Sequence, residues 1–431
     1  MGLDERLNDG TAVLGVVGLG YVGLPLAVEM AKAGYRVIGV DVSAQRVAQL
    51  DRGENYIPDV DGCELASLVG KGLVSATTDF SAMSVCDAIA ICVPTPLDEM
   101  KQPDTSYMES AARSITPHVK VGALVTLEST TYPGTTEEVI RPILESGGRK
   151  VGVDLFLAFS PERVDPGNPV FQTRNTPKVV GGVTKQCTAL AVAMYGRFID
   201  TLVPVSSTQA AEMTKLLENT FRGVNIALVN ELLLLCNRMG INLWEVIDAA
   251  KTKPFGFMPF YPGPGLGGHC IPIDPLYLSW KARQYDFRTE FIDLSGRINE
   301  SMPYYVIERL MDALNRHRKS LNGSRVLVLG VAYKPDISDM RESPAIIVTE
   351  LLAQKGAEVV YHDPHVPTFS AGGVTIPKVE LTAEEVSSAD VVLVITNHSG
   401  VDYDLVLREA ALVLDTRNAL KIDGDPKVVL L

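Results

Sequence analysis

The chain has few cysteines. Six are scattered over 431 residues, and none forms a Cys-x-x-Cys pair or the spacing of a metal site. Isolated thiols of this kind are typical of proteins in a reducing compartment, where disulfide bonds are rare. We therefore predict unbridged thiols, no structural metal and a cytoplasmic location.

Basic residues are also in deficit, since 39 lysines and arginines stand against 52 aspartates and glutamates and leave a net charge of −13. A surface of that sign repels nucleic acids and anionic membranes. Residues 1–9 carry three acidic side chains and lack the cationic and apolar regions of a secretory signal. No apolar run reaches the length that crosses a bilayer. We therefore expect neither a nucleic acid nor a membrane as partner.

The first motif predicts a dinucleotide site. A strand over residues 13–17 leads into Gly18, Gly20 and Gly23, a helix over 24–33, and a second strand that ends at Asp41. The glycines allow a tight turn, the approach of a pyrophosphate and close helix–strand packing. Asp41 can accept hydrogen bonds from a ribose and would repel a 2′-phosphate, so NAD is favoured over NADP. The alternative is a glycine-rich turn without a ligand, which the surrounding strand–helix–strand pattern disfavours.

Three further strands, over residues 88–93, 124–128 and 156–160, each end in a polar loop. Ligands of open α/β sheets bind beyond the carboxyl ends of the strands. Thr95, Thr130 and Glu162 in these loops are therefore expected to line a nicotinamide pocket. Each could instead be a helix cap or a turn residue.

Residues 206–239 predict one long helix, with a capping box formed by Ser206 and Gln209. Its length of about 50 Å exceeds the width of one small hydrophobic core. We therefore expect the helix to join domains and to be buried against a partner subunit. Lys215, Asn219 and Arg222 form one polar line, which indicates either site residues or a solvated face. The helix also carries apolar residues at intervals of three and four, namely Met213, Leu217, Phe221, Val224, Leu228, Leu232 and Leu235.

A segment rich in glycine and proline, residues 262–268, is followed by Cys270 and then by Asp274. Glycine and proline exclude helix or central strand there and let the backbone approach a ligand closely. A thiol on such a loop is a candidate nucleophile, and a nearby carboxylate can handle a proton. The alternative is a surface turn whose cysteine packs as a small hydrophobic residue.

The C-terminal part predicts a second doubly wound domain. A helix over 303–314 and a linker over 315–324 precede strands at 326–329, 358–361, 391–395 and 412–414. The first turn, 330–335, lacks the three-glycine pattern, and Lys334, Arg341 and Arg417 supply cations for a diphosphate. His362, Asp363 and His365 match no strong metal motif, so we interpret them as a turn at a strand end.

These patterns predict an α/β fold with two Rossmann-like doubly wound domains joined by a long central helix and a helical dimerisation region. The predicted boundaries are 1–205 for an NAD-binding domain, 206–320 for the central region with the cysteine loop, and 321–431 for the second Rossmann-like domain.

Seven motifs also resemble those of a known family. They are GLGYVGLP from Gly18, CVPTP from Cys92, ESTTYPGTT from Glu128, SPERVDPG from Ser160, Lys215 with Asn219, GGHCIPIDP from Gly267, and GVAYKPDISDMRES from Gly330. Together they resemble the nucleotide-sugar dehydrogenases, the UDP-glucose/GDP-mannose dehydrogenase family. The resemblance implies NAD as cofactor and a UDP-sugar as substrate, with the C6 alcohol oxidised to a carboxylate by two NAD⁺.

The resemblance implies roles for single residues as well. Cys270 would attack the C6 aldehyde, and Lys215 would stabilise the oxyanion. The remaining catalytic residues would be Asn219, Asp274, Glu162 and Thr130. The NAD contacts would be Gly18, Gly20, Tyr21, Val22, Gly23, Asp41, Arg46, Thr95, Thr130 and Arg341. The nucleotide-sugar contacts would be Arg163, Val164, Lys215, Asn219, Arg222, Gly267, Tyr333, Lys334 and Arg417.

Within the family, the Ser-Pro-Glu-Arg-Val motif at residues 160–164 and His269 resemble the branch that acts on UDP-N-acetylhexosamines, above all the UDP-N-acetylglucosamine 6-dehydrogenases. Arg163 could then bond the acetamido carbonyl. UDP-glucose and UDP-N-acetylmannosamine are the alternative substrates. In some UDP-glucose enzymes an arginine before the glycine loop reaches the site of the other subunit of the dimer. Here only Lys251 and Lys253 stand near that position in the sequence.

Two interpretations compete with this one. A single-step β-hydroxyacid or sugar-phosphate dehydrogenase would not account for Cys270 or for the last domain. A non-enzymatic NAD- or redox-sensing protein would need only Asp41 and the glycines.

Overall fold

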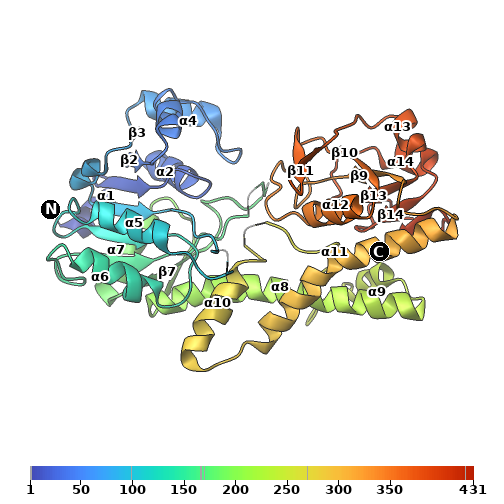
Figure 1. Cartoon of the computed structure of the whole chain (residues 1–431). Coiled ribbons are helices and arrows are strands. Elements are labelled where there is room, and N and C mark those ends of the chain that lie inside the picture. The colour runs from blue at the N-terminus through green and yellow to red at the C-terminus, as the bar shows by residue number, and fades with distance from the viewer. Residues whose placement is uncertain (1, 99, 166, 169, 269, 423) are drawn as a thin grey trace. The chain divides into compact units, whose positions relative to one another are not determined.

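The structure is a computed structural model that describes residues 2–98, 100–165, 167–168, 170–268, 270–422 and 424–431. The chain divides into two compact units (Figure 1). The first unit comprises Met1–Glu218 with Leu276–Phe287, and the second comprises Asn219–Pro275 with Arg288–Leu431.

The first unit is built on an eight-stranded sheet of order β3-β2-β1-β4-β5-β6-β7-β8. Neighbouring strands run parallel except for β6 and β7, which are antiparallel. The strands are β1 (Val13–Val17), β2 (Arg36–Val40), β3 (Val74–Thr77), β4 (Ala88–Ile91), β5 (Leu124–Leu127), β6 (Phe156–Phe159), β7 (Lys178–Gly182) and β8 (Leu202–Val205). The order β3-β2-β1-β4-β5-β6 reverses direction between β1 and β4, where doubly wound sheets bind dinucleotides.

Helices cover both faces of this sheet, so its central strands are mostly apolar and are buried along their whole length. The covering elements are α1 (Leu3–Asp9), α2 (Gly23–Lys32), α3 (Ala44–Asp51), α4 (Gly62–Gly70), η1 (Phe80–Val85), α5 (Ser106–Ile115), the π-helix η2 (Thr136–Ile140), α6 (Arg141–Glu145) and α7 (Lys185–Tyr195). Strands β4, β5 and β6 are buried at every position. The five strands predicted in this part of the sequence are confirmed to within two residues.

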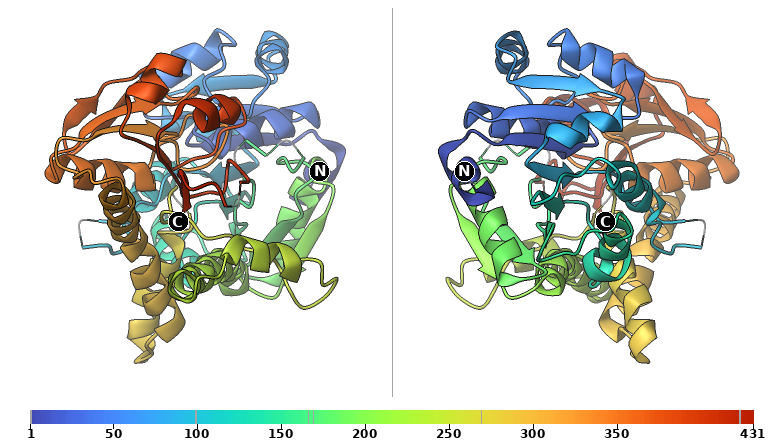
Figure 2. Two further views of the ribbon diagram at one scale, coloured as in Figure 1. Left: turned by 90° about the vertical axis from the view of Figure 1, so that its right-hand side faces the viewer. Right: turned by 90° about the vertical axis from the view of Figure 1, so that its left-hand side faces the viewer.

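The second unit contains a five-stranded parallel sheet of order β10-β9-β13-β14-β15, which confirms the second doubly wound fold. Its elements are β9 (Arg325–Leu329), α12 (Pro344–Gln354), β10 (Glu358–His362), α13 (Ala383–Ser388), β13 (Val391–Val394), α14 (Tyr403–Glu409), β14 (Val413–Asp415), β15 (Val428–Leu430) and the hairpin of β11 (Phe369–Ala371) and β12 (Val374–Ile376). Val326 and Val328 share a core with α12, while Leu327 and Leu329 share one with α13 and α14. Helices therefore cover both faces of this sheet as well (Figures 1 and 2).

The helical region consists of α8 (Thr208–Met239), α9 (Leu243–Ala250), α10 (Asp274–Ala282), the short η3 (Arg283–Tyr285) and α11 (Glu290–Arg316). The predicted capping box of Ser206 and Gln209 is wrong, because Ser207 precedes the helix and Ala210, three residues later, has no side-chain acceptor to complete a box. The Ser207 hydroxyl accepts the hydrogen bond from the Ala210 N–H at 3.1 Å, and α8 begins at Thr208. A cap side chain must stand directly before the first helical residue, and two adjacent serines do not reveal which one does.

The predicted helix over 303–314 is too short at its start, because α11 begins at Glu290 and contains Pro303. Proline lacks the N–H that would bond the carbonyl of Asn299 and normally ends a helix. Here Gly265 packs against this point, since a Cβ on Gly265 would lie 3.5 Å from both the Asn299 oxygen and the Pro303 ring. The packing of Gly265 against Pro303 is a tertiary contact that the local sequence does not show.

Candidate functional site

The glycine turn after β1 has the geometry of a dinucleotide cradle. Gly18 has φ of +90°, and a Cβ on Gly23 would lie 1.8 Å from the Gly18 oxygen, so both positions require glycine. At Gly20, no atom of the described residues lies within 4 Å of where a Cβ would stand. The turn is therefore open to a pyrophosphate at the helix N-terminus, where Tyr21 is half exposed and Val22 is the residue before α2.

Asp41 lies at the carboxyl end of β2 and is 5% exposed. Its carboxylate accepts hydrogen bonds from the N–H groups of Leu19 and Ser43, each at 2.8 Å. Arg46 lies 3.5 Å from the same carboxylate, with its own side chain half exposed. The acid is thus fixed beside the glycine turn, as an NAD ribose requires.

We expect Asp41→Ala to raise KM for NAD⁺ about tenfold, because a charge-assisted hydrogen bond to the ribose is lost. Discrimination against NADP⁺ should fall as well, since the repulsion of the 2′-phosphate disappears. Initial rates at varied NAD⁺ and NADP⁺ measure both effects, and KM for the nucleotide sugar is the internal control. An unchanged NAD⁺ to NADP⁺ preference would contradict this role.

The loops after β4, β5 and β6 are held at adjacent carboxyl strand ends. The carbonyls of Thr95 and Pro96 accept a hydrogen bond from the Tyr277 hydroxyl. Glu162 folds back on its own loop and accepts from the N–H of Arg163 at 2.8 Å and of Val164 at 2.7 Å. Thr130 is half-buried in the loop after β5. The expected cofactor-side residues of the first unit therefore lie along one edge of its sheet.

The loop that carries Thr130 is also tied to α8. Glu212 on α8 is fully buried and accepts hydrogen bonds from the N–H groups of Gly134 at 2.6 Å and Thr136 at 2.9 Å. Burial raises the pKa of Glu212, and these hydrogen bonds oppose the rise. Lys215 follows three residues later and is 8% exposed. The sequence did not reveal the role of Glu212. The only local indication is that this acidic residue lies on the same helix face as Lys215.

Two members of the polar line on α8 are buried, which a solvated face does not explain. Lys215 and Asn219 are 8% and 4% exposed, whereas Arg222 is exposed. Asn219 donates a hydrogen bond of 2.5 Å to the carboxylate of Asp274, which is itself 2% exposed. The fold thus brings together two residues that are 55 positions apart in the sequence.

Cys270 carries an exposed thiol in the second unit. Its carbonyl accepts hydrogen bonds from the N–H groups of Ile273 and Asp274, at 3.2 and 2.9 Å, so the cysteine stands one turn ahead of α10. His269, which the sequence associates with the substrate branch, lies outside the described residues. Exposure suits a nucleophile, and Cys92 by contrast is buried with its pKa raised by desolvation.

Buried amides anchor the start of the glycine loop. The Gly263 N–H donates to Asn230 at 3.0 Å, and Asn230 donates to Asn299 at 2.9 Å. Asn299 in turn donates to the Gly223 carbonyl at 3.1 Å. This chain of hydrogen bonds joins α8, α11 and the loop, and sequence reasoning missed it because single asparagines on a helix give no signal of their partners.

The end of the glycine loop packs against the turn after β9. A Cβ on Gly267 would lie 2.7 Å from the Tyr333 Cβ, and one on Gly268 would lie 2.8 Å from the Tyr333 ring. The Gly268 N–H donates to the Arg341 carbonyl at 3.0 Å, while the Arg341 guanidinium pairs with Asp339 at 2.6 Å. Gly267, Tyr333 and Arg341 are therefore neighbours, and Lys334 follows Tyr333 directly.

Arg417 lines a cavity of about 1080 Å³ in the second unit, at the carboxyl ends of β9, β13 and β14. Burial lowers the pKa of Arg417 to about 10 and Asp415 opposes the fall, so the guanidinium stays charged at neutral pH. Trp244 and Tyr261 stack in the wall of the cavity with ring centroids 5.6 Å apart. Cavities at this edge of a doubly wound sheet are the usual ligand sites, and this one combines a cation with aromatic rings.

Arg163 is held by other residues of the first unit. Its guanidinium pairs with Glu218 on α8 at 2.7 and 3.3 Å and donates to the Pro177 carbonyl at 2.5 Å. Among the described residues, three of its five N–H donors are used, which leaves two that could meet a ligand. Val164 follows it in the same loop.

Asp336, His365 and His398 have possible metal-ligand atoms within 4.8 Å of one another. Both ring nitrogens of His398 are nevertheless engaged, because Nδ1 accepts from the Asp336 N–H at 2.9 Å and Nε2 lies 3.0 Å from Asp363. A metal ion would have to displace these hydrogen bonds. The cluster is a set of hydrogen bonds that joins the loops after β9, β10 and β13, and His362 lies apart from it, with Nδ1 3.0 Å from the Val379 carbonyl.

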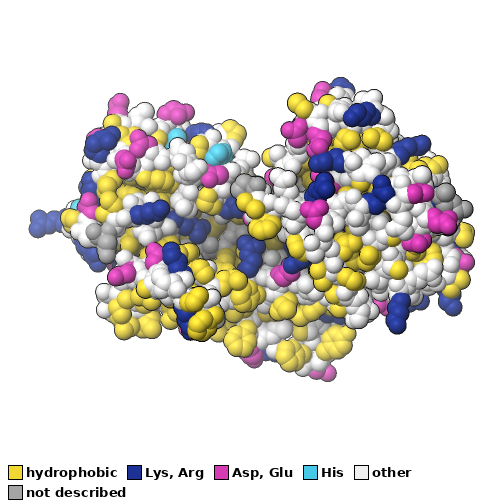
Figure 3. Space-filling view, turned by 180° about the vertical axis from the view of Figure 1, so that it is seen from behind, with side chains coloured by type: hydrophobic (Ala, Val, Ile, Leu, Met, Phe, Trp, Pro, Cys, Tyr) yellow, Lys and Arg dark blue, Asp and Glu magenta, His cyan; other side chains and the backbone are white. Residues whose placement is uncertain are grey.

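Six of the seven apolar residues predicted to line α8 are exposed, between 37% and 59%, and Val224 is half-buried. The exposed residues are Met213, Leu217, Phe221, Leu228, Leu232 and Leu235, which we call the α8 stripe. Hydrophobic side chains gather along the lower edge of the surface in Figure 3. Apolar residues at helical spacing normally face a core or a partner.

A glycine cradle with a buried acid, a second Rossmann-like unit with a cationic cavity, and an exposed thiol on a glycine loop define an α/β dinucleotide-dependent oxidoreductase. Three family models match the chain: the NAD binding domain over residues 12–199, the central domain over 209–301 and the UDP binding domain over 327–422 of the UDP-glucose/GDP-mannose dehydrogenase family. The chain belongs to the UDP-glucose/GDP-mannose dehydrogenase family.

Individual relatives agree with this assignment. The chain is 39% identical over 358 residues to UDP-N-acetyl-D-glucosamine 6-dehydrogenase of Pseudomonas aeruginosa, with 83% of each chain covered. It is 38% identical over 406 residues to UDP-N-acetyl-D-mannosamine dehydrogenase of Escherichia coli K12, covering 90% of this chain and 94% of that one. The crystal structure of a UDP-D-ManNAc dehydrogenase from Pyrococcus horikoshii superimposes with a TM-score of 0.87 at 33% identity, covering 97% and 98%.

The protein is thus an NAD-dependent nucleotide-sugar 6-dehydrogenase, and the interpretations as a single-step hydroxyacid dehydrogenase or as a non-enzymatic sensor are wrong. Within the described residues, no helix has both the length and the hydrophobicity needed to span a membrane.

Proposed function

We propose that the protein oxidises the C6 alcohol of a UDP-N-acetylhexosamine, most specifically UDP-N-acetylglucosamine, to the uronate, a precursor for surface polysaccharide. The observation that carries this proposal is the exposed Cys270 thiol. Cys270 stands four residues before Asp274, which is buried and accepts a hydrogen bond from Asn219. In a second oxidation, from aldehyde to acid, a nucleophile must add to the aldehyde carbon before the hydride is lost, and an exposed thiol such as Cys270 can be that nucleophile. The Pseudomonas relative, named for UDP-N-acetyl-D-glucosamine, supports the choice of sugar.

The first oxidation converts the C6 alcohol into an aldehyde. Two NAD⁺ molecules bound in turn would supply the hydride acceptors, one for each oxidation, and would be held by the glycine turn, Asp41, Arg46 and the Thr95 and Thr130 loops. Lys215 lies in a buried position on α8, where its ammonium can stabilise the alkoxide that forms as the C6 hydroxyl loses its proton.

The second oxidation proceeds on the thiol. The Cys270 thiolate adds to the aldehyde carbon, and loss of a hydride from the resulting thiohemiacetal leaves a thioester. Water then attacks the thioester carbonyl, the C–S bond breaks, and the carboxylate and the thiolate are released. Asn219 and Asp274 position the sugar and this water, because a buried hydrogen-bonded pair is already oriented. Glu162 and Thr130 are the catalytic residues proposed from the first unit.

The nucleoside diphosphate is proposed to bind in the second unit at the turn that carries Tyr333 and Lys334 and at the cavity lined by Arg417. Arg417 is a fixed cation there, and phosphate oxygens are its natural acceptors. Gly267 provides the close backbone approach next to the reactive loop, and Arg222 and Val164 complete the proposed substrate contacts. Arg341 is proposed to reach NAD after exchanging its pairing with Asp339.

Two other sugars are specific competitors. The relative from Escherichia coli and the structure from Pyrococcus horikoshii are both named for the N-acetylmannosamine derivative, which differs from N-acetylglucosamine at C2 only. UDP-glucose lacks the acetamido group. All three present the same C6 alcohol to Cys270, so the mechanism is independent of this choice.

A substrate panel tests the proposal. We expect UDP-N-acetylglucosamine to give the highest kcat/KM among UDP-glucose, UDP-N-acetylmannosamine, UDP-N-acetylgalactosamine and GDP-mannose, with two NADH formed per sugar consumed. NADH absorbance at 340 nm and quantified uronate give the ratio. One NADH per sugar would contradict the four-electron reaction, whereas two NADH with another preferred sugar would correct only the substrate.

Arg163 is proposed to donate one of its two remaining N–H groups to the acetamido carbonyl. We expect Arg163→Ala to lower kcat/KM for UDP-N-acetylglucosamine about tenfold and to change that for UDP-glucose much less, because a charged hydrogen bond is lost only with the acetamido sugar. Glu218→Gln weakens the ion pair between Arg163 and this position on α8, and it is the control for indirect effects. Equal losses on both sugars would count against this contact.

We propose that the α8 stripe is the interface of a homodimer or higher homo-oligomer, formed by a second copy of the same helix. Leu217, Phe221 and Leu228 have exposed fractions of 59%, 46% and 51%, an unfavourable arrangement on a 32-residue helix that stays in water. Leu228→Glu should therefore shift the mass measured by light scattering after gel filtration from dimer to monomer. Val246→Glu, an exposed position on α9, is the matched control, and a wild-type monomer would contradict the proposal.

A further inference from the structure

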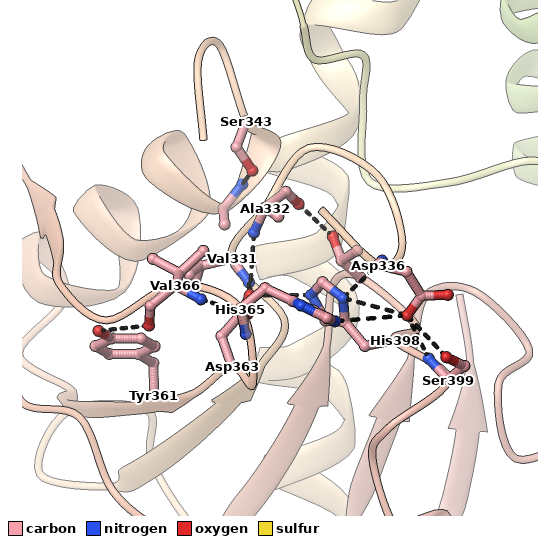
Figure 4. Close-up of polar contacts among 12 residues, drawn as sticks. Val331, Ala332, Asp336, Ser343, Tyr361, Asp363, His365, Val366, His398 and Ser399 are labelled. Carbon is pink, nitrogen blue, oxygen red and sulfur yellow. Dashed lines mark hydrogen bonds and ion pairs between the residues drawn. The ribbon is translucent and has the colours of Figure 1, made fainter. Parts of the chain in front are cut away.

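A hydrogen-bond cluster centred on Asp363 lies under the turn after β9 (Figure 4). Asp363 follows β10 directly and is fully buried. One carboxylate oxygen accepts from the N–H groups of Val331 at 2.7 Å and Ala332 at 3.2 Å and lies 3.0 Å from Nε2 of His398. The other accepts from the N–H groups of His365 and Val366, at 2.8 and 3.0 Å. Both oxygens therefore act only as acceptors.

His398 holds the other end of the same turn. Its ring is fully buried, and Nδ1 accepts from the Asp336 N–H at 2.9 Å, which leaves Nε2 as the protonated nitrogen that donates to Asp363. The Asp336 carboxylate accepts from the Ser399 N–H at 2.8 Å. The segment 331–336 is thus fixed at its start by Asp363 and at its end by His398.

The middle of this segment carries Tyr333 and Lys334, and Tyr333 covers Gly267 and Gly268. A side chain on either glycine would collide with Tyr333, at 2.7 and 2.8 Å. Cys270 stands two residues after Gly268. A continuous path of contacts within the second unit therefore runs from Asp363 and His398, through the turn and Tyr333, to the cysteine loop.

We propose that Asp363 and His398 are positioning residues that set the conformation of the turn 331–336 and, through Tyr333, the presentation of the Cys270 thiol. The inference rests on the proposed substrate contacts of Tyr333 and Lys334. Disruption of the pair changes UDP affinity and thiol reactivity together and leaves the glycine turn and Asp41, the proposed NAD contacts of the first unit, unchanged.

The charge of Asp363 is maintained by its partners. Burial opposes ionisation, but the hydrogen bonds from His398 and from the Val331 and His365 backbones outweigh it and bring the pKa of this carboxyl down to about 2. The carboxylate is therefore ionised at any pH at which the enzyme is assayed.

Three variants separate positioning from simple loss of structure. Asp363→Asn keeps the shape of the side chain. In either orientation of the amide, however, its NH₂ group would point at N–H groups that now donate to Asp363. His398→Asn retains an acceptor near Asp336 and loses the donor to Asp363, whereas His398→Gln can retain that donor and so acts as the conservative variant. His365→Asn is the matched control, because its imidazole touches the cluster, 5.0 Å from the His398 ring, while only its backbone bonds Asp363.

The readouts are the Kd of UDP by calorimetry, the rate of Cys270 alkylation by iodoacetamide without substrate, and the Kd of NAD⁺. We expect Asp363→Asn and His398→Asn to raise the Kd of UDP about tenfold or more and to change the alkylation rate severalfold, with NAD⁺ affinity within twofold of wild type. His398→Gln should recover part of the loss, and His365→Asn should behave as wild type.

Wild-type UDP affinity and alkylation rate in folded His398→Asn would overturn the proposal. So would equal loss of UDP and NAD⁺ binding in every folded variant, which would indicate general destabilisation. UDP binding and alkylation do not depend on which sugar is oxidised, so failure of the proposed substrate leaves this test valid.

Discussion

Replacement of Cys270 by serine is expected to abolish net formation of the uronate, with a fall in kcat of at least about three orders of magnitude. Serine retains the size of the side chain, but its hydroxyl is far less ionised near pH 7 than a thiol and a much poorer leaving group from an acyl intermediate. NADH per sugar consumed should fall from two to at most one, because the oxidation of the aldehyde needs the covalent step. Uronate quantified by chromatography, alongside NADH absorbance, measures both.

Cys63→Ser is the matched control, since Cys63 is the other cysteine with an exposed side chain in the described part of the chain and lies on α4 of the first unit. It should retain wild-type turnover. NAD⁺ affinity should be unchanged in both variants, because neither cysteine contacts the glycine turn in the proposed mechanism. Two NADH per sugar from Cys270→Ser would rule out the thioester.

Replacement of Lys215 by methionine is expected to lower kcat by about 10² to 10³ with a smaller change in KM for the sugar. Methionine retains the unbranched apolar stem of lysine and removes only the charge. The ammonium acts mainly when negative charge develops on the C6 oxygen, so its loss raises the barrier more than it weakens substrate binding. Steady-state kinetics at saturating NAD⁺ separate the two effects.

Arg238→Met, an exposed cation in the last turn of the same helix, controls for the loss of a positive charge from α8. It should retain wild-type kcat. A Lys215→Met enzyme whose loss appears entirely in KM would indicate that the lysine only binds the substrate, and the oxyanion role would then be wrong.

Local sequence patterns were sufficient for the two Rossmann-like units. Fully apolar runs such as residues 88–91 predict strands covered on both faces, and the spacing of Gly18, Gly20 and Gly23 predicts a tight turn in which Gly18 and Gly23 have no room for a side chain. The long helix α8 and its apolar stripe also follow from periodicity. The motifs around Cys270 indicated the chemistry, because the reactive atom and its glycine loop are contiguous in the chain.

The sequence could not provide contacts between residues far apart in the chain. Asn230 and Asn299 are 69 positions apart and Asp363 and His398 are 35 apart, yet each pair shares a buried hydrogen bond. A lone asparagine, aspartate or histidine has no local signature that identifies its partner, and the local sequence does not show that α11 continues through Pro303 or that Gly265 packs there.

The sequence by itself therefore determined which Rossmann-like units form and which dinucleotide is bound, because these depend on short contiguous motifs. It also predicts which residues carry the reactive groups. The tertiary structure decided which side chains are buried together, that Lys215 and Asn219 are withdrawn from solvent, and how the turn 331–336 is fixed. Burial and hydrogen-bond partners are properties of the assembled chain, since they require segments from distant parts of the sequence to meet.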